Sequence, residues 1–298
     1  MKKILILIVA IILVVGGFLG WVFTREEGGV PILAYHQVNN IDKNQLTTTV
    51  EDFDAQMKYL VDDGYTIITP EELVEAWGGV EGEVAEGSEG AENGTANTAV
   101  TLPEKPIIIT LDDGYVDTYK NVFPILQKYN IKATLFVITD YLNLYPNYIT
   151  WAQAREMQSS GLVDIESHTL SHFNLVERRL STYEIRNQLY GSKQAIEWYL
   201  KKPANYVAYP GGLYTQEIED LSKDVGYKAA FTVDYGLSHQ LPQHYVLPRI
   251  PIFGNNSYPL LRFKIRVKLA PLIAPLHRFK EQLIKDGNGA VADFIWIP

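Results

Sequence analysis

Short apolar runs recur along the chain, and stretches with apolar residues at helical spacing separate most of them. The runs are rich in Val, Ile and other residues that favour buried strands. We expect strands at residues 31–36, 65–68, 106–111, 133–139, 162–167, 206–209 and 229–233. Their number and spacing are typical of a protein in which strands and helices alternate.

The intervening stretches predict helices. Thr48 and Glu51 form a capping-box pattern for a helix that ends at Gly64, and Thr69 precedes a second helix. Further helices are expected at residues 118–129, 151–160, 182–199 and 216–225. Strands that alternate with helices imply a parallel sheet or barrel, so the predicted fold class is α/β.

The amino-terminal segment has a different pattern. Lys2 and Lys3 precede an uninterrupted apolar run at residues 4–23, and about 20 helical residues are enough to cross a bilayer. We therefore expect a transmembrane anchor within residues 1–24 and a linker at 25–30, with a cleaved signal peptide as the alternative. The two lysines favour an extracytoplasmic position for the rest of the chain.

Two other segments depart from the alternation. Residues 78–104 carry glutamates, Gly, Ala, Asn and Thr with little apolar content, which predicts a disordered acidic loop inserted in a domain at 31–253. Residues 254–298 form a basic extension of unknown role. Within it, charged and apolar residues alternate at 262–269 as in a half-exposed strand, whereas 276–284 have a helical pattern.

Composition narrows the possible partners and metal ligands. The 298 residues are 47% hydrophobic, enough for a sizeable core, and the formal net charge of −9 argues against nucleic acid as a partner. No cysteine is present, so a metal would have to be held by His, Asp or Glu.

Polar residues follow four of the predicted strands, at the edge where α/β proteins usually bind ligands. His36, Asp112 with Asp113, the segment 168–172 and the segment 209–212 all lie there. Two histidines four residues apart, together with a carboxylate from another strand, can hold a divalent metal and leave positions open for water. Taken singly, an Asp-Asp-Gly is usually a turn and such a His pair is usually structural, but their coincidence favours a hydrolytic metal site.

These motifs resemble those of the polysaccharide deacetylase family, carbohydrate esterase family 4, over about residues 31–252. The family's Thr-Phe-Asp-Asp-Gly motif corresponds to residues 110–114, and its His-Ser/Thr-x-x-His motif to residues 168–172. The resemblance implies a distorted (β/α) barrel in which Asp113, His168 and His172 bind a divalent metal. Zinc is the default, and cobalt, nickel or iron would also suit these ligands.

The resemblance also implies catalytic roles. Asp112 would be the general base that activates water, and Gly211 would donate its backbone N–H to the oxyanion. The family's Arg-x-Pro-Tyr motif is replaced here by residues 208–212, which lack both the Arg and the Tyr. Arg249 is the candidate for the arginine that orients the base, with an ordinary surface charge as the alternative.

The segment 31–38 resembles the opening of a circularly permuted subgroup, the poly-β-1,6-N-acetylglucosamine N-deacetylases, in which His36 would be the general acid. The implied function is removal of N-acetyl groups from an extracellular polysaccharide containing N-acetylglucosamine, by an enzyme attached to the membrane. A peptidoglycan deacetylase or an O-acetyl esterase would use the same site. A degenerate glycan-binding module would retain the barrel but lose the base or a metal ligand.

Overall fold

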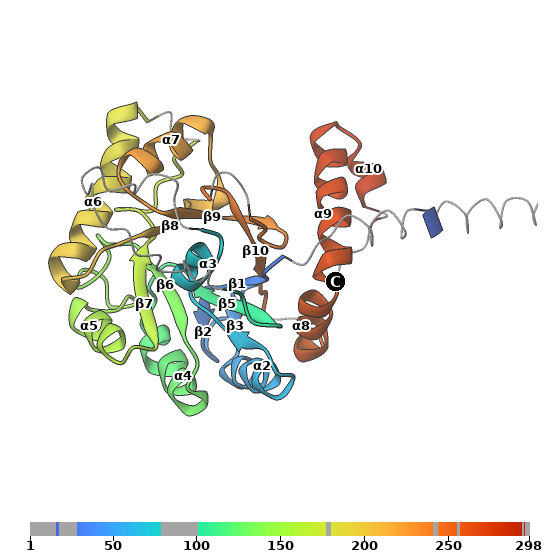
Figure 1. Cartoon of the computed structure of the whole chain (residues 1–298), viewed down its shortest axis with the longest axis horizontal. Coiled ribbons are helices and arrows are strands. Elements are labelled where there is room, and N and C mark those ends of the chain that lie inside the picture. The colour runs from blue at the N-terminus through green and yellow to red at the C-terminus, as the bar shows by residue number, and fades with distance from the viewer. Residues whose placement is uncertain are drawn as a thin grey trace, which may run out of the picture.

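Seven parallel strands close into a barrel in the computed structural model, which describes residues 16–17, 29–78, 101–176, 180–240, 244–254, 257–293 and 295. Figure 1 shows the strands around the centre of the molecule with helices outside them. Around the barrel the order is β1, β10, β9, β8, β7, β6 and β5, and pairing of β1 with β5 closes the ring. The expected barrel of alternating strands and helices is therefore confirmed.

The strands of the barrel are β1 (Ile32–Tyr35), β5 (Pro106–Leu111), β6 (Ala133–Val137), β7 (Val163–Ser167), β8 (Tyr206–Ala208), β9 (Ala229–Tyr235) and β10 (Leu247–Pro251). Strand β4 (Thr66–Ile67) pairs with the start of β5, and β2 (Gln37–Val38) pairs with β3 (Thr47–Thr48) beside the barrel. All seven expected strands form where the sequence predicts them: six lie in the ring, and the seventh is β4. Strand β10 was not predicted, because two prolines interrupt its apolar pattern.

The helices that follow the strands are α2 (Val50–Asp62), α3 (Pro70–Ala76), η1 (Thr118–Val122) with α4 (Phe123–Tyr129), α5 (Trp151–Ser159), α6 (Thr182–Leu200), η2 (Pro210–Gly212) and α7 (Gln216–Asp224). Capping side chains fix several starts: Thr69 and Glu72 form a complete capping box for α3. For α2 the prediction was one residue early. Thr49, rather than Thr48, caps this helix by accepting a hydrogen bond from the backbone N–H of Asp52.

Apolar side chains pack on both surfaces of the barrel wall. In β1, Ile32 and Leu33 are fully buried in different clusters, as expected for successive residues of a strand. The cluster that contains Ile32 also contains Phe136 and Phe231, whose ring centroids lie 5.3 Å apart, and it fills the barrel interior. The cluster that contains Leu33 joins the barrel wall to the surrounding helices. Burial on both surfaces explains why the strands are continuous apolar runs.

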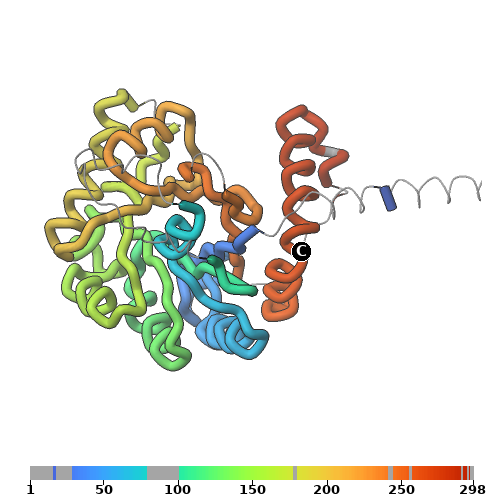
Figure 2. The backbone as a smooth tube through the Cα atoms, in the orientation of Figure 1, coloured from blue at the N-terminus to red at the C-terminus, as the bar shows by residue number. Residues whose placement is uncertain are grey.

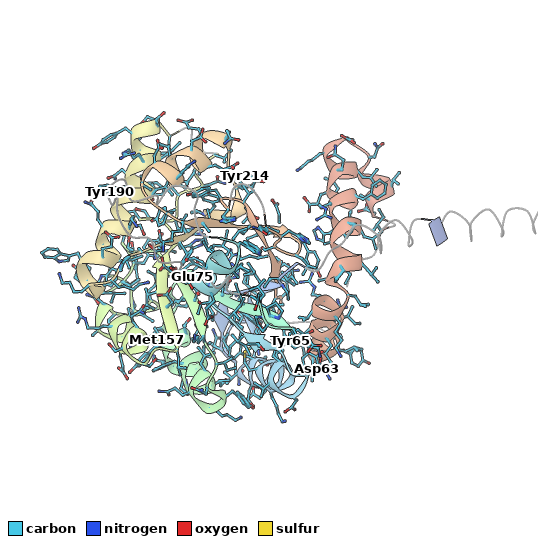
Figure 3. All side chains as sticks on the ribbon, in the orientation of Figure 1. Asp63, Tyr65, Glu75, Met157, Tyr190 and Tyr214 are labelled. Carbon is cyan, nitrogen blue, oxygen red and sulfur yellow. The ribbon has the colours of Figure 1, made fainter. Side chains whose placement is uncertain are left out.

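The carboxyl-terminal segment is helical and packs on the barrel. It forms α8 (Pro259–Lys268), α9 (Ala270–Lys285) and α10 (Gly289–Ala292). The alternation at residues 262–269 suited a strand but left the segment unassigned, and the structure makes it a helix, because the buried residues Phe263 and Val267 are four apart and lie on one face of α8. Figure 2 shows this segment beside the tube of the barrel. Figure 3 labels Asp63, at the end of α2 next to α8, where its carboxylate lies 3.2 Å from the Lys268 ammonium.

Two predicted features lie outside the described residues. The transmembrane run at residues 4–23 is described only at residues 16–17, and the acidic loop is not described at residues 79–100. Among the helices of the described ranges, none combines the length and the apolar content needed to cross a bilayer.

A buried ion pair inside the barrel provides a test of the packing. The Lys202 ammonium lies 2.7 Å from a carboxylate oxygen of Glu166, whose side chain is only 1% exposed. Burial raises the pKa of Glu166 to about 8, and the charge of Lys202 opposes that rise. Lys202→Met is expected to lower the free energy of unfolding by about 3–5 kcal/mol, because it leaves the carboxyl buried without its partner.

This deficit should depend on pH in a defined direction. A carboxyl whose pKa is raised in the folded state favours folding when it is protonated, so its unfavourable contribution grows as the pH rises from about 5 to 8. That change between pH 5 and 8 is common to both proteins, because the pKa of Glu166 is already about 8 with Lys202 present. Urea unfolding of Lys202→Met should therefore show a similar deficit at pH 5 and pH 7, and the deficit should grow above pH 8, where only the wild-type carboxyl ionises. Lys223→Met, at an exposed lysine of α7, is the matched control and should change stability by less than about 1 kcal/mol. Equal losses in both variants would contradict the proposed role of this ion pair.

Candidate active site

The four polar segments expected at strand ends meet at the carboxyl end of the barrel. The pairing of Tyr35 with Leu111 places His36 next to Asp112, and the pairing of Val137 with Ser167 leads to His168 on the next strands. A cavity of about 500 Å³ opens at this end. All the predicted site residues except Arg249 line it: His36, Asp112, Asp113, His168, His172 and Gly211.

Three of these residues form a group that can hold a metal ion. The ligand atoms of Asp113, His168 and His172 lie within 4.8 Å of one another. One carboxylate oxygen of Asp113 is 3.4 Å from Nε2 of His168 and 3.6 Å from Nε2 of His172. A tetrahedral zinc ion about 2.1 Å from each ligand would separate the ligand atoms by roughly 3.4 Å. The spacing therefore fits a metal ion, and it is too long for hydrogen bonds.

The protonation of His168 supports the same conclusion. Its Nδ1 is 2.8 Å from the carbonyl oxygen of Ala208, which can only accept, so Nδ1 carries the proton. Burial lowers the pKa of His168 to about 3, so the ring is neutral near pH 7. Its Nε2 thus directs a lone pair toward the Asp113 carboxylate. A cation between the Asp113 oxygen and Nε2 of His168 would relieve the repulsion of their lone pairs. The hydrogen bond from Nδ1 to the Ala208 carbonyl fixes the orientation of the ring, as hydrogen bonds to metal-binding histidines commonly do.

The backbone at this group is held in an uncommon conformation. Asp113, Thr169 and His172 have φ values of 73°, 65° and 55°. Each such residue other than glycine costs on the order of 1–3 kcal/mol, and such residues concentrate at functional sites. Gly114, with φ of 85°, follows Asp113, and a Cβ atom there would lie 3.1 Å from Val137. The sequence therefore turns sharply after β5 so that Asp113 faces the histidines.

Asp112 has a different environment from its neighbour. Two nitrogens of Arg249 donate hydrogen bonds to its two carboxylate oxygens, each at 2.7 Å. Arg249 also donates to Thr110 Oγ1 and to the carbonyl of Thr232, and it is fully buried in the barrel. Burial raises the pKa of Asp112, but the charge and hydrogen bonds of Arg249, together with the nearby His168 and His36, outweigh burial and hold this pKa well below its usual range. Asp112 is therefore ionised, oriented and able to accept a proton.

The pKa of Asp113 is shifted in the opposite direction to that of Asp112. Burial raises its pKa to about 6, while His36 lowers it and the negative charge of Asp112 raises it further. A positive charge between Asp113 and the histidines would favour the ionised form. The two adjacent carboxylates thus differ in partner and in pKa, as expected for groups with different tasks.

The structure buries Arg249 against Asp112 rather than on the surface, where it would position the Asp112 carboxylate, and this leads to a prediction. Arg249→Met is expected to lower the free energy of unfolding by about 3–5 kcal/mol, because it leaves the Asp112 carboxylate buried and unpaired. Arg249→Lys keeps one charge but cannot donate two parallel hydrogen bonds, so it should recover stability better than turnover. Urea unfolding and activity per folded molecule on both variants test this. Full activity in folded Arg249→Met would contradict the positioning role.

His36 lies between β1 and β2 at the wall of the cavity. Its neighbour Tyr35 accepts a hydrogen bond from the backbone N–H of Asp112 at 2.9 Å, which ties the two strand ends together. Its Nδ1 is buried and has no hydrogen-bond partner among the described residues. A buried polar atom of this kind calls for an explanation, and a ligand in the cavity is one.

Gly211 lies at the rim of the same cavity, after β8. Its φ of 63° is readily adopted by glycine, and a Cβ atom there would meet no atom within 4 Å. The adjacent Gly212 is more restricted, since its Cβ would lie 2.4 Å from the backbone of Val233. The two glycines therefore let the chain turn closely over β9 and expose Gly211 to the cavity.

The sequence did not predict several residues of the cavity. Tyr115 stacks on Tyr148 with ring centroids 5.0 Å apart, and its hydroxyl interacts with the Asp113 carboxylate. Tyr235 comes from the end of β9 and Phe253 from the segment after β10, while Arg266 and His277 come from the extension that had no assigned role. No motif in the sequence marks these four residues, and only the packing of α8 and α9 brings Arg266 and His277 to the site.

Comparisons with known proteins agree with this geometry. Residues 99–230 match the family described as polysaccharide deacetylase. Deacetylases of this family are metal-dependent, and Asp113, His168 and His172 form a possible metal site. This chain carries a polysaccharide deacetylase domain.

Two relatives show how far the similarity extends. The Bacillus subtilis (strain 168) protein YxkH, named as a polysaccharide deacetylase, is 29% identical over 241 residues, which are 80% of this chain and 76% of YxkH. The poly-beta-1,6-N-acetyl-D-glucosamine N-deacetylase of Staphylococcus epidermidis is 33% identical over 172 residues. That match covers 54% of this chain and 58% of the staphylococcal protein, so the chain spans less than two thirds of that relative.

A solved structure has the same fold. The Streptococcus pyogenes deacetylase PplD, solved in complex with acetate, superposes with a TM-score of 0.67 at 26% identity. The match covers 79% of this chain and 97% of that one. The seven-stranded barrel is therefore the polysaccharide deacetylase barrel, and the chain is an enzyme of this family.

Proposed function

We propose that this deacetylase removes N-acetyl groups from N-acetylglucosamine units of an extracellular polysaccharide, and that poly-β-1,6-N-acetylglucosamine is its substrate. The observation that carries the proposal is the pairing of two carboxylates with different tasks in one cavity. Asp113 lies 3.4 Å and 3.6 Å from two histidine nitrogens, whereas Asp112 is bound on both oxygens by Arg249. This division suits metal-dependent hydrolysis of an amide.

Asp113, His168 and His172 would hold the metal ion, which is zinc by default and cobalt, nickel or iron as alternatives. A divalent ion supplies Lewis acidity, which polarises a carbonyl and lowers the pKa of water. Asp112 accepts the proton of the attacking water, and Arg249 keeps its carboxylate ionised and aimed at the cavity. The N–H of Gly211 donates to the developing oxyanion, and His36, at the end of the strand next to that of Asp112, protonates the leaving nitrogen.

The choice of polymer rests on two features of the chain. His36 follows the first strand, as in the permuted subgroup that it resembles, and it reaches the same cavity as the metal ligands. The Staphylococcus epidermidis relative carries the name of this substrate and shares 33% of residues over the matched part. Together they favour poly-β-1,6-N-acetylglucosamine over peptidoglycan or an O-acetylated polymer.

The proposed location is outside the cytoplasm, with the chain held at the membrane by its amino-terminal segment. The support is the apolar run at residues 4–23, preceded by Lys2 and Lys3. A polymer that cannot enter the cell requires an enzyme on the same side of the membrane. Protease digestion of intact cells, with detection of the carboxyl terminus, should degrade the barrel; full protection of the barrel would contradict this location.

One assay tests the substrate and the metal together. We expect the purified chain to release acetate from poly-β-1,6-N-acetylglucosamine oligomers faster than from peptidoglycan fragments. Dialysis against a chelator should abolish this release, and stoichiometric Zn²⁺ or Co²⁺ should restore it. Faster release from peptidoglycan would replace the proposed polymer, and activity that persists in metal-free protein would overturn the proposed chemistry. A folded, metal-loaded chain that binds glycan without releasing acetate would indicate a glycan-binding module.

A further inference from the structure

A second cavity adjoins the catalytic one. Its volume is about 670 Å³, in the range of cavities that hold small ligands. Both cavities are lined by Gly211, Val233, Tyr235 and His277. The two spaces therefore lie side by side between the end of β9 and the helix α9, which places the second next to a molecule bound in the first.

One wall of the second cavity comes from α9, in the extension that had no assigned role. Figure 1 shows α9 beside the barrel, near β9 and β10. The helix is anchored by Ala270, Ile273 and Ala274, which are buried in the main apolar cluster. At the rim, the His277 ring stacks on Tyr235 with centroids 5.1 Å apart and planes 13° apart. The wall is therefore attached to the barrel where the two cavities meet.

The lining has two kinds of surface. Leu213, Val246 and Pro248 contribute apolar atoms, whereas Asp234, Glu281 and Gln282 contribute hydrogen-bonding groups. A pyranose ring presents the same combination, with C–H groups on its faces and hydroxyl groups around its edge. Both acidic and basic side chains line the cavity, since Lys285 also contributes to it. This balance suits a neutral, hydroxyl-rich ligand better than an anion or a cation.

We propose that the second cavity is a sugar subsite: it binds the N-acetylhexosamine unit next to the one whose acetyl group is removed, and α9 forms its outer wall. The inference rests on the proposed function, because it assigns the neighbouring unit of the same polymer. In this proposal the carboxyl-terminal helices contribute to substrate specificity, because they make the enzyme prefer a chain of sugars over a single unit. The subsite contributes binding that is equal in the ground state and the transition state, so it lowers KM without changing kcat.

Three variants on α9 test the subsite. Gln282→Trp fills the cavity and Glu281→Ala removes a hydrogen-bonding group, while Phe279→Ala truncates an exposed side chain of the same helix outside the cavity. Each variant is assayed with an N-acetylglucosamine tetramer and with a small activated acetyl ester that occupies the catalytic cavity alone. We expect Gln282→Trp to raise KM for the tetramer by about tenfold or more, equal to about 1.4 kcal/mol of binding. Glu281→Ala should have a smaller effect, and Phe279→Ala none.

The outcomes separate this inference from the proposed function. Hydrolysis of the ester, bound metal and melting temperature should stay at the wild-type level in all three variants. If Gln282→Trp hydrolyses the tetramer like the wild type, the subsite is wrong and the deacetylase function stands. If it loses ester and tetramer activity together, α9 supports the catalytic site and the subsite is again wrong. If the wild type releases no acetate from the tetramer but hydrolyses the ester, the proposed function fails, and the subsite fails with it.

Discussion

Asp112→Asn should keep its bound metal and lose turnover by about 10²–10⁴-fold, whereas Asp113→Ala should lose the metal itself. The reason is the different environment of the two neighbouring carboxylates. An oxygen of Asp113 lies 3.4 Å from Nε2 of His168, at the spacing of two ligands of one ion. Both oxygens of Asp112 are bound to Arg249, so an amide there retains the shape of the side chain but cannot accept a proton.

The measurement is metal content and turnover on the same purified samples. Asparagine also leaves the buried Arg249 charge without a carboxylate, so we expect a lower melting temperature and express activity per folded molecule. Arg249→Lys provides a control in which the orientation of Asp112 changes and its charge does not. Equal metal loss in Asp112→Asn and Asp113→Ala would mean that both carboxylates bind the metal, and the assigned division of roles would be wrong.

The residues at the strand ends could be predicted because each polar residue directly follows an apolar run in the sequence. An apolar run such as residues 106–111 ends in two aspartates, and in a parallel barrel every such end lies on the same side. The prediction therefore grouped His36, Asp112, Asp113, His168 and His172 without knowledge of their distances, and all five line one cavity. The sequence could not give the difference in pKa between the two aspartates, because the pKa of Asp112 depends on its contact with Arg249, which is 137 residues away in the chain.

The carboxyl-terminal extension shows where local patterns fail. In residues 262–269 every second residue is apolar, and both a strand and a helix can use part of that pattern. The helix forms because Phe263 and Val267 pack into the same cluster as the helices around the barrel. Packing between distant segments thus decides the structure, and it also brings Arg266 and His277 to the catalytic cavity. No pattern within the extension carries information about that cavity.

His36→Ala is expected to retain metal and to lose turnover by about 10²–10⁴-fold, the usual contribution of a positioned general acid. His36 follows β1, which pairs directly with the strand that ends in Asp112, so the two side chains reach the cavity from adjacent strand ends. His36→Gln keeps a polar side chain of similar length but cannot act as an acid near neutral pH. Both variants should therefore be slow to a similar degree.

A purely structural role for His36 makes the opposite prediction. Its removal would then lower stability by a few kcal/mol and leave turnover per folded molecule nearly unchanged. The structure argues against this, because Nδ1 of His36 is buried without a hydrogen-bond partner in the described part of the chain, so truncation breaks no bond at that atom. Melting temperature, bound metal and turnover measured on one preparation separate the two roles. A destabilised His36→Ala with near-native turnover would remove His36 from the mechanism, and with it the feature that most favours poly-β-1,6-N-acetylglucosamine as the substrate.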